Sequence, residues 1–150
     1  MATETISKFY ADDHNRLDGL FEQCLKLKEK DLHQAVDVLE QFKTGLEQHM
    51  AWEEAILFSE YDSRIPSADE ESPTVDLRFE HEQLREYLGI VLRKLKANDR
   101  DTEKDESRLA ELLGAHNWAE ETGLYLKLDE ILTDQDREEI RQRMKDSALT

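Results

Sequence analysis

The chain has 150 residues, of which 38% are hydrophobic and 37% charged, and its formal net charge at pH 7 is −16. This length suits one domain with one core, and so negative a charge argues against partners such as nucleic acid or an anionic membrane surface. Because no apolar run approaches the ~20 residues that span a bilayer, no signal-peptide pattern opens the chain, and Cys24 is its single cysteine, we expect a cytoplasmic protein.

Four segments have apolar residues at alternating spacings of three and four, which predicts amphipathic helices. The first covers about residues 7–29. The second begins at DLHQ, residues 31–34, which resembles a capping box, and extends to Leu57. The third follows Pro73, a residue suited to a first helical turn, and extends to Leu95. The fourth begins near Ser107 and extends to Leu124.

A short fifth helix is predicted over about residues 134–147, and it is capped by Thr133 or Asp134. A loop, YDSRIPSADEES, and a polar turn, ANDRDTEKDE, connect the long segments. Short connections between long helices favour antiparallel neighbours. We therefore predict an all-α fold: an up-down-up-down four-helix bundle over about residues 7–130 with a short additional C-terminal helix, forming a single domain over residues 1–150.

Histidines mark one position on the apolar face of each long segment: His14, His49, His81 and His116. His33, in the first turn of the second helix, is expected to be exposed to solvent. The spacing from His14 to His49 equals that from His81 to His116. Placing the first pair on the second aligns HMAWEEAILFSEYD (49–62) with HNWAEETGLYLKLD (116–129). This alignment of the two halves indicates a duplicated helix pair.

Each half also carries a glutamate four residues after its second histidine, Glu53 and Glu120. Six such groups buried at one level, without cationic side chains beside them, would be strongly destabilising unless they bound a metal. Imidazole with carboxylate suits iron, manganese or zinc, and six ligands exceed the needs of one tetrahedral zinc. They suit two six-coordinate ions, each held by two histidines and bridged by both glutamates. An oxo or hydroxo bridge would then leave about one open position on each ion.

The stretches DDH (12–14), HMAWEEAILF (49–58), FEHEQL (79–84) and HNWAEETGLY (116–125) resemble the hemerythrin-like, or HHE cation-binding, family. The resemblance covers about residues 7–130. It implies a four-helix bundle around a non-haem di-iron centre. It also implies a ligand set, with the two glutamates as bridges, or with Glu121 in place of Glu120: His14, His49, Glu53, His81, His116 and Glu120.

The resemblance leaves several functions open. Oxygen-carrying members have a fifth histidine where this chain has Arg85, so a symmetric four-histidine centre is more similar to stress-response members. We expect a di-iron protein that binds or senses a small oxidising ligand: O2, NO or peroxide. The alternative is a stress-response enzyme that reduces NO or peroxide or repairs iron-sulfur centres. Iron storage is less favoured because a site for two ions has too small a capacity to store iron. We expect a monomer or weak dimer, and a separate protein partner stays open.

Neighbours of the histidines carry further expectations. Asp18 and Arg85 each lie four residues after a histidine and are equivalent in the repeat. We expect them to pair, with an additional ligand role for Asp18 or two outward-facing charges as alternatives. Tyr10 is expected to pack in the core rather than to contact the metals. Glu54 is expected to face outward, and two tryptophans are expected to pack between helices, Trp52 and Trp118.

Overall fold

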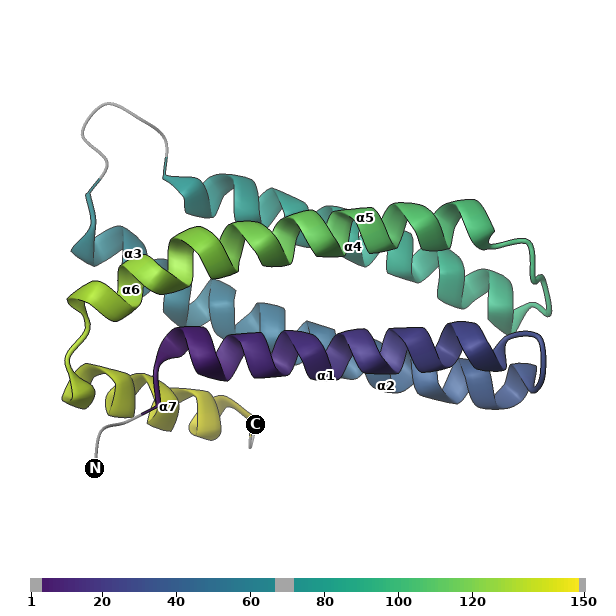
Figure 1. Ribbon diagram of the computed structural model, residues 1–150, viewed down its shortest axis with the longest axis horizontal. Coiled ribbons are helices and arrows are strands. Elements are labelled where there is room, and N and C mark those ends of the chain that lie inside the picture. The colour runs from purple at the N-terminus through teal and green to yellow at the C-terminus, as the bar shows by residue number, and fades with distance from the viewer. Residues whose placement is uncertain (1–3, 67–71, 149–150) are drawn as a thin grey trace.

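Helices account for nearly all of the computed structural model, which describes residues 4–66 and 72–148 (Figure 1). The α-helices are α1 (Ile6–Leu27), α2 (Leu32–Trp52), α3 (Phe58–Arg64), α4 (Pro73–Lys96), α5 (Glu103–Ala119), α6 (Tyr125–Ile131) and α7 (Asp134–Ala148). Two π-helical segments, η1 (Glu53–Leu57) and η2 (Glu120–Leu124), join α2 to α3 and α5 to α6 without a break. The described residues thus form five continuous helices and contain no strand, which confirms the predicted all-α fold.

The four long helices run along the long axis of the molecule in alternating directions, and α7 lies beside one end of them (Figure 1). Side-chain caps set where several helices begin. Thr5 accepts a hydrogen bond from the Lys8 N–H at 3.1 Å, and Asp31 accepts one from the Gln34 N–H at 3.1 Å. Two predicted boundaries were wrong, because helix continues through Arg64 and α5 begins at Glu103 rather than near Ser107.

Two apolar clusters fill the bundle. One, at the end away from α7, includes Phe21, Phe42 and Leu88. The other includes Leu57 and Leu128 together with residues that α7 contributes, Ile140 and Met144. His14, His81 and His116 each lie along the chain between residues of the two clusters, so buried polar side chains occupy the middle of the core. None of the described helices has both the length and the apolar character needed to cross a membrane.

Candidate metal centre

All six predicted ligand residues meet in the core of the bundle. Each long helix supplies one histidine, and each π-helical segment begins with one of the glutamates. None of these side chains is more than 4% exposed: His14, His49, Glu53, His81, His116 and Glu120.

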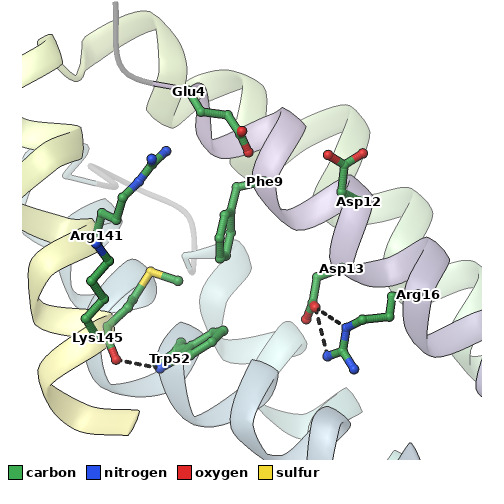
Figure 2. Close-up of a pocket in the computed structure, with 9 residues that line it drawn as sticks. Glu4, Phe9, Asp12, Asp13, Arg16, Trp52, Arg141 and Lys145 are labelled. Atoms are coloured by element: carbon green, nitrogen blue, oxygen red, sulfur yellow. Dashed lines mark hydrogen bonds and ion pairs between the residues drawn. The ribbon is translucent and has the colours of Figure 1, made fainter. Parts of the chain in front are cut away.

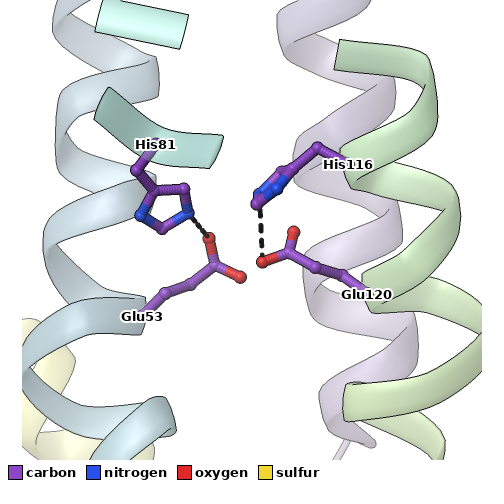
Figure 3. A group of neighbouring side chains, drawn as sticks. All are labelled: Glu53, His81, His116 and Glu120. Atoms are coloured by element: carbon purple, nitrogen blue, oxygen red, sulfur yellow. Dashed lines mark ion pairs between the residues drawn. The ribbon is translucent and has the colours of Figure 1, made fainter. Parts of the chain in front are cut away.

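Each glutamate lies close to one histidine from each half of the repeat. Oxygens of Glu120 lie 3.2 Å from His14 Nε2 and 3.2 Å from His116 Nε2. Glu53 Oε1 lies 3.4 Å from His49 Nε2 and 3.3 Å from His81 Nε2. The side chains therefore form two groups whose ligand atoms lie within 4.8 Å of one another: Glu53, His81, His116 and Glu120 (Figure 3), and His14, His49 and Glu120.

Several atoms of these groups lack a hydrogen-bond partner although they are buried. They include Glu53 Oε1, Glu120 Oε2, His81 Nε2 and His116 Nε2. A buried polar atom without a partner costs about 1–3 kcal/mol, and these face one another. Imidazole nitrogen with carboxylate oxygen is a donor set for first-row transition metals. The residues present thus fit metal cations.

A second carboxylate lies on the far side of each imidazole ring. His49 Nδ1 lies 2.8 Å from Asp13, and His81 Nδ1 lies 3.0 Å from Glu54. His116 Nδ1 lies 2.8 Å from Glu80. His14 Nδ1 lies 3.5 Å from Glu121. The three hydrogen-bonded outer carboxylates fix the orientation of their rings, so that Nε2 of each points to the opposite side. His14 Nδ1, in contrast, has no hydrogen-bond partner in the described part of the chain.

The position of these four acids beside the imidazole Nδ1 atoms was not predicted: Glu121 was named only as an alternative to Glu120, and the expectation that Glu54 faces outward was wrong. The signal was nevertheless present, because each acid directly precedes or follows a ligand residue. The alignment of the two halves also relates Asp13 to Glu80 and Glu54 to Glu121. The repeat therefore duplicates the outer carboxylates together with the ligands.

Tyr125 is a further buried residue at the centre that sequence reasoning missed. Its hydroxyl oxygen lies 2.7 Å from Glu53 Oε2 and 2.9 Å from Glu120 Oε1, so the O–H donates to these carboxylates. In the repeat Tyr125 aligns with Phe58, whose ring stacks on His81 at 5.4 Å. An aromatic residue five positions after each glutamate was the available signal.

The buried groups shift one another's pKa values. Burial raises the pKa of Glu53, and the charge of Glu120 raises it further. Burial opposes ionisation of Glu120 as well, but hydrogen bonding to Glu53 and the nearby His116 hold its pKa well below the usual range. Burial likewise disfavours the charged form of His116, but the charge and hydrogen bond of Glu120, together with Glu80 and Glu53, outweigh it and raise the pKa of His116 to about 10. Protons thus occupy sites for which a bound cation would compete.

Arg85 pairs with acids other than Asp18. Its guanidinium donates to Glu47 at 3.2 Å, to Glu54 at 3.1 Å and to Glu82. The predicted Arg85–Asp18 pair was wrong because Arg85 reaches toward α2, whereas Asp18 lies on the exposed side of α1. Asp18 also belongs to neither ligand group.

The remaining aromatic expectations had mixed outcomes. Tyr10 packs in the core, where its ring lies edge-on to His49 at 5.0 Å and its O–H contacts Met144 Sδ at 3.4 Å. Trp52 packs against Phe9, as expected. Trp118 is 68% exposed, so its predicted packing was wrong. The difference arises because α7 covers Trp52, whose indole N–H donates to the Met144 carbonyl at 3.2 Å.

Comparison with known families matched the chain to the hemerythrin HHE cation binding domain over residues 5–145. Comparisons with curated proteins and with solved structures gave no match. The matched span contains all six ligand candidates and the helix α7 up to Lys145.

Proposed function

Because the chain belongs to the hemerythrin HHE cation-binding domain family, we propose that it holds two iron ions and uses them to bind or sense a small oxidising ligand: O2, NO or peroxide. The observation that carries this proposal is the position of the two glutamates. Each approaches one histidine from either half of the repeat, as a carboxylate that bridges two ions must do.

In this proposal the two histidines of each half of the repeat bind the same ion. His14 and His49 would hold one ion, His81 and His116 would hold the other, and Glu53 and Glu120 would be shared by both. Four protein ligands for each ion would leave room for a small exogenous ligand. The bound iron pair would supply one-electron redox chemistry and a position for this ligand.

The residues around the centre have separate roles in the proposal. The outer carboxylates hold the imidazole rings, and Tyr125 donates its hydrogen bond to the bridging glutamates. The apolar clusters on either side exclude bulk water from the site. A buried centre of this kind admits diatomic ligands or peroxide more readily than larger substrates.

Metal analysis of the purified protein tests whether the chain binds two iron ions. We expect about two iron ions per chain, because the ligand set proposed above binds two ions. Replacing Glu53 with Gln should remove a bridging oxygen and lower the iron content, whereas Glu4→Gln, at an exposed site, should leave it unchanged. One zinc per chain would contradict the proposal.

Optical spectra test whether the bound iron binds O2, NO or peroxide. The reduced, iron-loaded protein is mixed with O2, NO or peroxide, and the absorption bands are followed over time. A stable or reversible adduct supports binding or sensing. Catalytic consumption of NO or peroxide would favour the stress-response enzyme, and iron that stays unchanged with all three ligands would contradict both.

A further inference from the structure

A cavity of about 670 Å³ lies between α1, the end of α2 and α7, outside the metal centre (Figure 2). Its apolar lining is formed by Phe9, Trp52 and Met144. The rings of Phe9 and Trp52 are 6.1 Å apart and tilted by 53°. The Trp52 indole N–H is held by the Met144 carbonyl and by Ser147 Oγ, which fixes the ring within the wall. A volume of this size suits a small organic molecule, and fixed aromatic rings suit a planar one.

The charges around the cavity are not balanced. Its acids already have cationic neighbours: Asp13 pairs with Arg16, Asp12 pairs with Lys8, and Glu4 interacts electrostatically with the same Lys8. The side chains of Arg141 and Lys145, on the α7 side, have no hydrogen-bond or ion-pair partner among residues 4–66 and 72–148. The unpaired charge at this cavity is therefore positive, although the net charge of the chain is −16.

The repeat provides an internal comparison. A groove of about 430 Å³ occupies the equivalent place in the second half of the chain, and it is lined in part by Asp76, Glu80 and Ala119. The alignment of the two halves places these three on Phe9, Asp13 and Trp52. The carboxylate beside the histidine is thus kept in both halves, whereas only the first half has two aromatic rings and the cations of α7. Duplication of the metal ligands therefore does not account for the features that make this cavity distinct.

We propose that the cavity between α1, α2 and α7 binds a small aromatic anion, whose ring lies against Phe9 and Trp52 and whose acidic group contacts Arg141 and Lys145. This site is separate from the metal centre, because Nε2 of His49 faces the metal ligands while Asp13, on the Nδ1 side, lines the cavity. The inference does not depend on which metal the protein holds.

The test uses 8-anilinonaphthalene-1-sulfonate as the aromatic anion and N-phenyl-1-naphthylamine as its neutral counterpart. The protein is the full chain with its metal bound, and it carries Trp118→Phe so that Trp52 is the only tryptophan left. We expect saturable binding to a single class of sites, with energy transfer from Trp52. The sulfonate should bind about tenfold more tightly than the neutral compound, because only the sulfonate can accept charge-assisted hydrogen bonds from Arg141 and Lys145.

Two double variants with the same change in net charge locate the site. Arg141→Gln with Lys145→Gln should weaken binding of the sulfonate about tenfold or more and leave the neutral compound unaffected. Lys43→Gln with Arg93→Gln, at exposed positions away from the cavity, should leave both affinities unchanged. Circular dichroism verifies that each variant is folded. Non-saturable binding, equal affinity for the two compounds, or an equal loss in both double variants would overturn the proposal.

Discussion

Adjacent residues at the candidate metal centre contact different histidines. Glu53 approaches His49 and His81 through its carboxylate, while the next residue, Glu54, contacts the opposite nitrogen of His81. Successive residues of a helix point about 100° apart, so the neighbour of an inward-facing ligand points sideways toward the next helix. A pair of adjacent residues thus supplies both a ligand and the acid that orients a ligand from another helix.

Asp13→Asn is predicted to weaken metal binding without disturbing the fold. The amide keeps the size of Asp13 but loses the charge that accepts the hydrogen bond from His49 Nδ1 at 2.8 Å. Loss of such an outer partner lowers metal affinity about 10- to 100-fold. Competition with a chelator measures the change.

Asp12→Asn is the matched control, because Asp12 is exposed and pairs only with the exposed Lys8 in its contacts within the described chain. We expect its metal affinity to equal that of the unmodified protein. Equal affinities for all three proteins would show that Asp13 does not orient His49.

The π-helical segments change the helical phase of two helices at the candidate metal centre. The N–H of Phe58 donates to the carbonyl of Glu53, and the N–H of Tyr125 donates to that of Glu120, each five residues back. A π-turn inserts one residue into the α-helical pattern and occurs often at functional sites. Here it brings Phe58 and Tyr125 onto the inner face beside the ligands while the helices continue to α3 and α6.

Two glycines inside helices are predicted to respond oppositely to alanine. A methyl group added at Gly19 would have no neighbouring atom within 4 Å, so Gly19→Ala should stabilise the protein by about 0.5–1 kcal/mol. At Gly45 the methyl group would lie 2.7 Å from Leu17 Cδ2 and 3.2 Å from an Arg16 nitrogen. Because Leu17 is buried where α1 meets α2, Gly45→Ala should instead destabilise by about 1 kcal/mol or more.

Urea unfolding of both variants gives these free energies. The opposite effects of the two substitutions are expected because α1 and α2 are in close contact at Gly45 and not at Gly19. A similar gain in stability for both would mean that the helices do not approach so closely at Gly45.

Glu60 is predicted to link α3 to α7 in a pH-dependent way. Its carboxylate accepts hydrogen bonds from Arg64 at 2.7 Å and from Arg143 at 2.8 Å. Hydrogen bonding to Arg64, with that to Arg143, lowers the pKa of Glu60 below 4.5. The folded state therefore favours the ionised form, and its stabilisation is present above pH 4.5 and lost as the pH falls through the lower folded pKa.

Glu60→Gln should thus cost about 0.5–1 kcal/mol at pH 7 and progressively less as the pH falls below 4.5. Thermal unfolding between pH 3 and pH 7 measures the difference. Glu138→Gln, at an exposed position on α7, serves as the control and should show no such pH dependence. A constant difference across this range would contradict the role given to Glu60.

At the scale of the whole molecule, the core contains a polar layer between two apolar clusters. Removing metal with a chelator should therefore lower the free energy of unfolding of the entire bundle, because the ligands come from all four long helices. Free metal at 100 times its dissociation constant should stabilise the fold by about 2.7 kcal/mol. Calorimetry with and without chelator measures the shift, and an unfolding temperature independent of metal would contradict it.

The sequence by itself determined the all-α fold, the five helices and the six residues that converge on the candidate metal centre. Helical periodicity places a histidine on the inner face of each long helix, and the internal repeat relates the two halves. These features depend on local spacing along one helix, which is readable in the order of the residues.

Only the tertiary structure decided how side chains on different helices meet. It directed Arg85 to Glu54 and Glu47 rather than to Asp18, and it placed the Tyr125 hydroxyl between the glutamates. It also covered Trp52 with α7 while leaving Trp118 exposed. Such contacts depend on helix rotation, on the π-turns and on the position of α7, because a shift of one residue turns a side chain by about 100°.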